Sequence, residues 1–188
     1  FGESLMPGIL GQFKRYHPQV RIVARVDRNG PLRQALAEEA LDLALLWQTE
    51  DQGPGMGRCP LAWIAHPDLD IGALLASGEP LPLVMFDSPC LMRSRAIACL
   101  DAAGIPWQVV FVSHSLNGIW AAVQAGLGLT IRTRIGMPGN LRTVAGLLPS
   151  PGSLAVNLQQ TPREGQHSAA VALLGDLMTE ALQGWVEM

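Results

Sequence analysis

The sequence has few charged side chains, few aromatic side chains and no long apolar run. Charged residues make up 15% and aromatic residues 5% of the 188 residues, and 13 basic against 16 acidic residues give a net charge of −3. A surface that binds nucleic acid usually carries a basic excess or stripe, so we expect no DNA contact from these residues. A membrane span needs about 20 consecutive apolar residues, so we expect no membrane segment either.

Cysteine is also scarce, and familiar catalytic signatures are absent. Cys59, Cys90 and Cys99 have no CxxC spacing, which predicts no disulfide framework and favours a reduced, cytoplasmic protein. The four histidines show no metal-ligand spacing, and the GxSxG, GxxxxGK[ST] and HExxH motifs are missing. We therefore predict a protein that is not an enzyme, without metal or cofactor. Cys90 leaves a redox or nucleophilic role open, because a thiol at a helix N-terminus can become reactive.

Helical and strand patterns alternate along the chain, which is typical of an α/β protein. The first part predicts a helix over residues 6–17, a strand over 20–26, a helix from Pro31 and a strand over 41–47. The continuous apolar character of 41–47 favours a parallel sheet that is covered on both faces.

The rest of the chain continues this alternation. Strands are predicted over 61–66, 81–86, 107–112, 127–131 and 153–160, and helices over 71–76, 89–103, 116–127 and 166–186. The stretches 48–58 and 134–152 are rich in Gly and Pro and predict loops. Gly104 and Gly126 are expected to end the helices that precede them.

Small polar residues occupy the predicted strand-to-helix turns, namely 29–31, 47–49, 87–89 and 113–115. In open α/β sheets, ligands bind outside the carboxyl ends of the strands, where helix N-termini offer free N–H groups. The pattern predicts two small lobes with a ligand cleft between them. The alternative is that Ser88 and Ser115 only cap helices.

Three stretches resemble the effector-binding domain of LysR-type transcriptional regulators. They are Leu5-Met6-Pro7 leading to the run FKRYHPQV at 13–20, Gly30–Leu36 followed by ALDLAL at 40–45, and Ser115-Leu116 followed by VQAGLGL at 123–129. They occur in the order and spacing of the family and cover essentially the whole chain. Residues 81–133, including Trp120, most resemble the subgroup of motility and virulence repressors.

The resemblance implies a two-lobed fold of the type II periplasmic-binding-protein class. Each lobe would be a small, mixed, mostly parallel sheet flanked by helices, with lobe I over 1–66 plus 153–188 and lobe II over 67–152. It further implies an N-terminal winged helix-turn-helix domain that binds DNA and is absent from this chain, and a first strand that would precede Phe1.

The resemblance also implies a small effector in the interlobe cleft and a homodimer, with a tetramer possible in the full-length protein. The positions that match the family's effector site are Ser4, Asn29, Trp47, Gln48, Thr49, Ser88, Cys90, His114, Ser115 and Thr133. Those that match its dimer interface are Ile9, Phe13, Arg21, Val23, Leu116, Trp120 and Gln124.

Two other functions compete with the regulator. An exported solute-binding protein has the same fold, but it would need an upstream signal peptide and is usually longer. A two-lobed α/β enzyme is disfavoured because the sequence holds no catalytic constellation. The residues alone identify neither the effector nor the promoters.

Overall fold

The computed structural model describes residues 2, 4–48, 55–161 and 168–186. The chain divides into two compact units, unit 1 with Phe1–Cys59 and Leu154–Met188, and unit 2 with Pro60–Ser153. It passes from one unit to the other in strands β2 (Gly57–Ala65) and β7 (Ser153–Gln160). The lobe limits predicted from the sequence, at 66/67 and 152/153, stay a prediction. Among the described residues, no helix is both long enough and apolar enough to cross a membrane.

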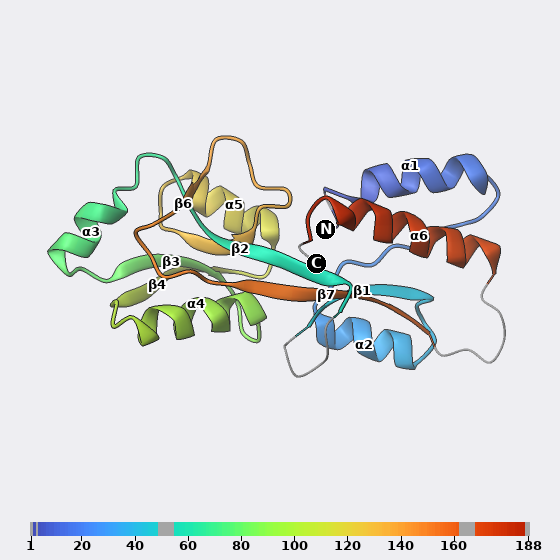
Figure 1. Ribbon diagram of the computed structural model, residues 1–188, viewed down its shortest axis with the longest axis horizontal. Helices are drawn as coiled ribbons and strands as arrows, with labels where there is room; N and C mark the ends of the chain where they lie inside the picture. The colour runs from blue at the N-terminus through green and yellow to red at the C-terminus, as the bar shows by residue number, and fades with distance from the viewer. Residues whose placement is uncertain (1, 3, 49–54, 162–167, 187–188) are drawn as a thin grey trace. The chain divides into compact units, whose positions relative to one another are not determined.

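Unit 1 contains helices on both sides of its strands. Helices α1 (Met6–Tyr16) and α6 (Ala169–Gln183) lie side by side on one side of β1 (Leu43–Gln48) and β7, and α2 (Asn29–Ala37) lies on the other (Figure 1). Ile9 and Phe13 of α1 pack against Leu177 of α6. A second cluster, between α2 and β1, contains Leu32, Leu36, Ala44 and Leu46. Burial of these apolar faces is the main force that holds the layers together.

The strand predicted over 20–26 is wrong. This segment belongs to no sheet in the described part of the chain, and Val23 and Val26 are 73% and 76% exposed. β-branched residues favour an extended backbone, but a strand also needs a neighbour whose N–H and C=O groups complete the ladder. The segment therefore leaves apolar side chains on the surface.

The parallel pairing predicted for 41–47 is also wrong, because β1 runs antiparallel to β7, with Leu43 opposite Gln160. Alternate residues of β1 are fully and partly buried. Ala44 and Leu46 face α2, and the intervening Leu43, Leu45 and Trp47 are half-buried. Both faces are thus covered without a parallel neighbour, which explains the continuous apolar run.

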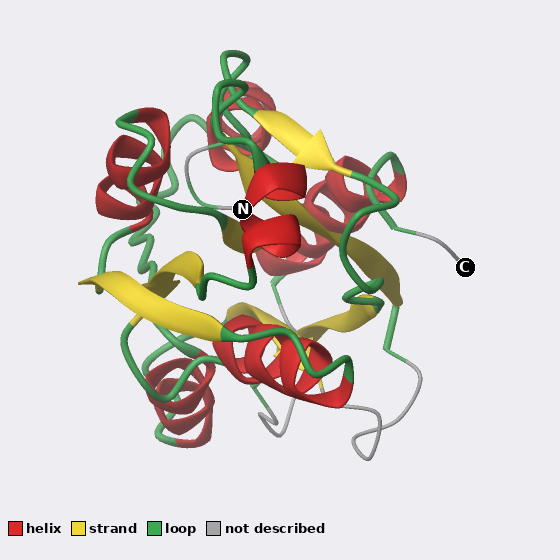
Figure 2. Cartoon of the chain, turned by 90° about the vertical axis from the view of Figure 1, so that its left-hand side faces the viewer, coloured by secondary structure: helices red, strands yellow, loops and turns green. Residues whose placement is uncertain are grey.

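Unit 2 combines antiparallel and parallel strands. β2 pairs antiparallel with β5 (Thr130–Thr133) and β6 (Arg142–Val144). β3 (Leu81–Phe86) pairs parallel with β4 (Trp107–Ser113), and a parallel bridge joins Leu83 to Leu129. Helices α4 (Leu91–Ala102) and α5 (Leu116–Gln124) lie on opposite sides of these strands, and the short α3 (Ile71–Ser77) packs near β3 (Figure 1). Figure 2 shows the helices, strands and loops of the chain after a turn of 90° about the vertical axis.

Two element starts in unit 2 differ from the prediction. α4 begins at Leu91 instead of Pro89, so that Met92, Ala96 and Leu100 face the core together. β5 begins at Thr130 instead of Leu127, which is 50% exposed. The helix stop predicted at Gly126 is confirmed by its φ of 75°. Strand β6 lies inside the stretch that the sequence predicts as a loop.

Candidate functional site

The carboxyl ends of β3 and β4 carry four of the predicted effector residues. Because these strands are parallel and Phe86 lies opposite Ser113, both strands end at the same edge of the sheet. The Asp87 N–H donates to the Ser113 carbonyl over 3.2 Å, which holds the two turns together. The turn 88–90 leads into α4 and the turn 113–115 leads into α5. The structure therefore brings Ser88 and Cys90 to the same edge as His114 and Ser115.

The N-termini of α4 and α5 have no side-chain cap. Cys90 and Ser115 occupy the N-cap positions, and neither side chain accepts a hydrogen bond from the first turn. Ser113 Oγ instead accepts from the Ser115 N–H over 3.1 Å. Ser88 lies two residues before the N-cap position of α4. The predicted cap is therefore contradicted for Ser115, and Ser88 does not occupy the cap position that the sequence predicts.

Of the other four helices among the described residues, two lack a side-chain cap and two have one. α1, which follows the predicted effector position Ser4, and α2, which begins at the predicted position Asn29, also lack a side-chain cap in the described chain. In contrast, Asp70 Oδ1 accepts from the Ala73 N–H over 2.9 Å in α3, and Ser168 Oγ accepts from the Val171 N–H over 3.3 Å in α6. An uncapped first turn offers N–H donors and the positive end of the helix dipole to a ligand.

The predicted residues of unit 1 differ in their surroundings. Asn29 bonds twice to the backbone of Trp47, donating from Nδ2 to the carbonyl over 2.6 Å and accepting from the N–H over 3.1 Å. Gln48 is 4% exposed, and its Oε1 accepts no hydrogen bond from a described residue. Ser4 is exposed in the turn before α1. Thr49 lies outside the described residues.

Arg132, which the sequence analysis did not select, lies beside this edge. It precedes the predicted Thr133 on β5, and its guanidinium carbon lies 4.0 Å from the centre of the Phe86 ring. Its Nη1 donates to Met92 Sδ over 3.2 Å, and its Nε is buried without an acceptor among the described residues. Burial lowers the pKa of Arg132 to about 10, and the neighbouring Cys90 opposes this shift. The sequence feature that could have identified Arg132 is that it is the one charged residue in the stretch 127–133.

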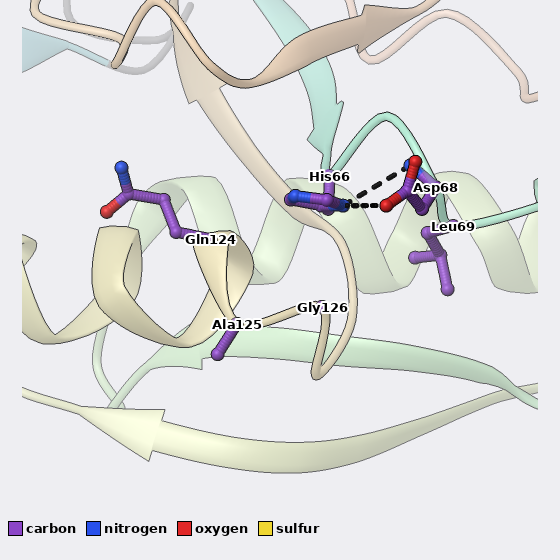
Figure 3. Close-up of a pocket in the computed structure, with 6 residues that line it drawn as sticks. All are labelled: His66, Asp68, Leu69, Gln124, Ala125 and Gly126. Atoms are coloured by element: carbon purple, nitrogen blue, oxygen red, sulfur yellow. Dashed lines mark hydrogen bonds and ion pairs between the residues drawn. The ribbon is translucent and has the colours of Figure 1, made fainter.

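A small pocket lies at the opposite end of α5. It has a volume of about 280 Å³ and is lined by His66, Asp68, Leu69, Gln124, Ala125 and Gly126 (Figure 3). His66 Nδ1 accepts from the Asp68 N–H over 3.3 Å, and Gln124 Nε2 donates to Asn140 Oδ1 over 2.8 Å. No predicted effector residue lines it. The described residues hold no group of three His, Cys, Asp or Glu side chains that could bind a metal ion.

The predicted interface residues differ in exposure. Ile9, Phe13 and Trp120 are buried in the cores of their own units, and Leu116 is half-buried against the core of unit 2. Arg21, Val23 and Gln124 are exposed. A second protein chain could therefore contact the latter three directly.

Comparisons with known proteins identify the family of this chain. The family model for the LysR substrate binding domain matches residues 1–183. The HTH-type transcriptional regulator PecT of Dickeya dadantii (strain 3937) is 30% identical over 144 residues, which are 76% of this chain and 44% of PecT. DgdR of Burkholderia cepacia, also an HTH-type transcriptional regulator, is 29% identical over 174 residues, which are 90% of this chain and 58% of DgdR. The chain thus spans about half the length of these relatives.

A solved structure confirms the fold. The effector-binding domain of QuiR in complex with shikimate superposes with a TM-score of 0.70 at 14% identity, over 98% of this chain and 91% of the chain of that domain. This similarity supports the predicted α/β fold of the periplasmic-binding-protein type. The family and its relatives are regulators and not enzymes, which favours the regulator over the transport alternative. The chain therefore belongs to the LysR substrate-binding domain family, the effector-binding domains of LysR-type transcriptional regulators.

Proposed function

We propose that this chain is the effector-sensing and dimerisation domain of a bacterial LysR-type regulator that acts in the cytoplasm. A small effector binds at the predicted residues, and DNA contacts come from a separate N-terminal domain of the longer protein. Binding changes the arrangement of the dimer and with it the affinity for the promoter. The subgroup of motility and virulence repressors remains part of this proposal.

The distribution of helix caps is the observation that carries the effector proposal. The four helices that begin at or just after predicted effector positions, α1, α2, α4 and α5, have no side-chain cap, whereas α3 and α6 are capped by Asp70 and Ser168. Replacing a capping side chain typically costs about 1 kcal/mol, so its absence needs a compensating partner or exposure to water. A polar ligand that accepts hydrogen bonds from these N–H groups is such a partner.

Regulation then follows from linkage. An effector shifts an equilibrium only by the difference between its affinities for the two arrangements. Coupling free energies are typically about 1–3 kcal/mol, which corresponds to roughly 5–150-fold in affinity. The effector therefore needs only a few hydrogen bonds that differ between the arrangements of the dimer.

Bulky substitutions at the shared edge of β3 and β4 test effector binding. A thermal-shift screen of small metabolites identifies a ligand, and native mass spectrometry of the freshly purified chain detects one that is retained. Ser88→Trp and Ser115→Trp should then abolish the ligand-induced shift without lowering the melting temperature of the free chain. Ser77→Trp, at the exposed C-terminal end of α3, is the matched control and should keep the shift. Retained binding in both edge variants would contradict the site.

Dimerisation is supported by the apolar surface of the segment 20–26, which belongs to no sheet in the described part of the chain. Val23 and Val26 are highly exposed there, and Tyr16 at the end of α1 is 70% exposed as well. The unpaired backbone of an extended segment is a template for pairing with a second chain. We propose that a second copy of this chain covers this segment and the exposed side of α5, including Gln124.

Light scattering of the purified chain tests the dimer. The wild type should have the mass of a dimer at micromolar concentration, and Val23→Asp should have the mass of a monomer. Val110→Asp, on an exposed position of β4, is the matched control and should remain dimeric. A monomeric wild type would refute this interface.

A further inference from the structure

We propose that Arg132 and the first turn of α4 form a subsite for an oxyanion, namely a carboxylate, sulfate or phosphate group of the effector. This inference rests on the proposed function, since it names the chemical class of the molecule that the domain senses. It concerns unit 2 alone, because β5, α4 and the end of β3 all belong to that unit.

The first argument is the uncompensated charge of Arg132. A guanidinium has five N–H donors and no acceptor, and buried charges in proteins are normally paired. The hydrogen bond from Nη1 to Met92 Sδ uses a weak acceptor, and Nε has no acceptor among the described residues. No described Asp or Glu forms an ion pair with Arg132. The site therefore supplies a cation and lacks the anion that would complete it.

The second argument is the position of this cation at an open helix N-terminus. Met92, which accepts from Arg132, lies in the first turn of α4, and the N-cap residue Cys90 provides no side-chain cap. α4 has 12 residues, so its aligned peptide dipoles place positive partial charge at this end. Two positive groups at one place repel each other unless an anion lies between them. An oxyanion can accept from the guanidinium and from the free N–H groups of the helix together.

The third argument is the way the guanidinium is held. The guanidinium carbon lies over the Phe86 ring, 4.0 Å from its centre, and the contact with Met92 fixes one of the guanidinium nitrogens. A planar fork held in this way suits bidentate contact with a carboxylate, sulfate or phosphate. The apolar surroundings lower the local dielectric constant, which strengthens the attraction for an anion. If the aromatic contact were the whole role of Arg132, anions would have no effect on the chain.

Titration of the chain with sodium sulfate, sodium phosphate, shikimate and the methyl ester of shikimate tests the subsite. Sodium chloride at matched ionic strength is the reference for the thermal shift and for calorimetry. At least one oxyanion should stabilise the chain, and the uncharged ester should not. Arg132→Gln should weaken that binding by about tenfold or more, as expected for loss of charge-assisted hydrogen bonds. Arg134→Gln, two residues further on and exposed, should bind like the wild type.

A measurement on the wild-type chain keeps the test independent of variant folding. The Arg132 Nε–H resonance, assigned by its loss in Arg132→Lys, should shift when the oxyanion binds. Failure of all three oxyanions to stabilise the chain or to shift this resonance overturns the subsite. Oxyanion binding that is unchanged in Arg132→Gln is that of an adventitious ion only, and overturns it as well. A neutral effector that binds wild type and Arg132→Gln equally would overturn the subsite while effector sensing stands.

Discussion

The side-chain amide of Asn29 takes the place of a neighbouring strand for the backbone of Trp47. Nδ2 donates to the Trp47 carbonyl and Oδ1 accepts from the Trp47 N–H. These two bonds join the start of α2 to the end of β1, 18 residues apart in the chain. A residue at a predicted ligand position thus also fixes the geometry of the strand that leads to Gln48.

Asn29→Ala should lower the stability of the chain by about 1–3 kcal/mol, because it removes both hydrogen bonds between this side chain and the partly buried backbone of Trp47. Urea unfolding followed by circular dichroism measures the effect. Asn117→Ala, at an exposed position of α5, is the control and should change the urea midpoint little. Equal midpoints for the two variants would show that the bonds to Trp47 contribute nothing.

Capped and uncapped helices should respond differently to alanine. Asp70→Ala and Ser168→Ala remove hydrogen bonds to Ala73 and Val171, so each should cost about 1 kcal/mol. Cys90→Ala and Ser115→Ala remove no cap and should cost much less. Urea midpoints of the four variants, measured without added ligand, check this difference. A loss at Ser115 as large as that at Ser168 would contradict the assignment of Ser115 as uncapped.

Cys59 should make the stability depend on pH in the alkaline range. Burial raises the pKa of this thiol from 9.0 to about 11 in the folded chain. Between these values the unfolded chain releases a proton that the folded chain retains, so stability falls as pH rises. The expected loss at pH 10 relative to pH 8 is about 1 kcal/mol. Cys59→Ala should lack this part of the decrease; parallel curves for the two proteins would contradict it.

Gly128 should tolerate no side chain. A Cβ at this position would lie 2.3 Å from the carbonyl oxygen of Pro82, where Leu129 donates its N–H. Gly128→Ala must displace β3 or the start of β5, and overpacking of this kind costs about 1–3 kcal/mol. Gly139→Ala meets nothing within 4 Å and should be neutral. Urea midpoints separate the two variants, and a neutral Gly128→Ala would contradict this contact.

Elements whose ends are marked by local signals could be predicted from the sequence. β3 and β7 have the predicted limits, since Pro80 precedes one and Pro151-Gly152 precedes the other. The segment 20–26 has the same β-branched composition but no partner strand in the described chain. Strand formation there depends on tertiary pairing, which local composition does not encode.

In the candidate site, too, features set by local sequence could be predicted and features set by tertiary contacts could not. Turn composition selected Ser88 and Ser115, and the parallel register of β3 and β4 places their turns at one edge. Arg132 could not be selected in this way, because its surroundings are formed by Phe86 and Met92, which lie 46 and 40 residues away in sequence. Asn29 was selected because it lies in a predicted turn. Its two hydrogen bonds to the Trp47 backbone are tertiary contacts, which turn composition does not predict.

The two chain crossings in β2 and β7 also constrain the order of folding. Unit 2 is one continuous segment, so all of its contacts can form once residues 60–153 have left the ribosome. Unit 1 is discontinuous, because β1 must wait for β7, with Leu43 opposite Gln160, and α1 must wait for α6. During synthesis the N-terminal segment therefore stays incomplete while the inserted unit is already able to fold. Unit 1 is completed only when β7 pairs with β1 and α6 packs against α1.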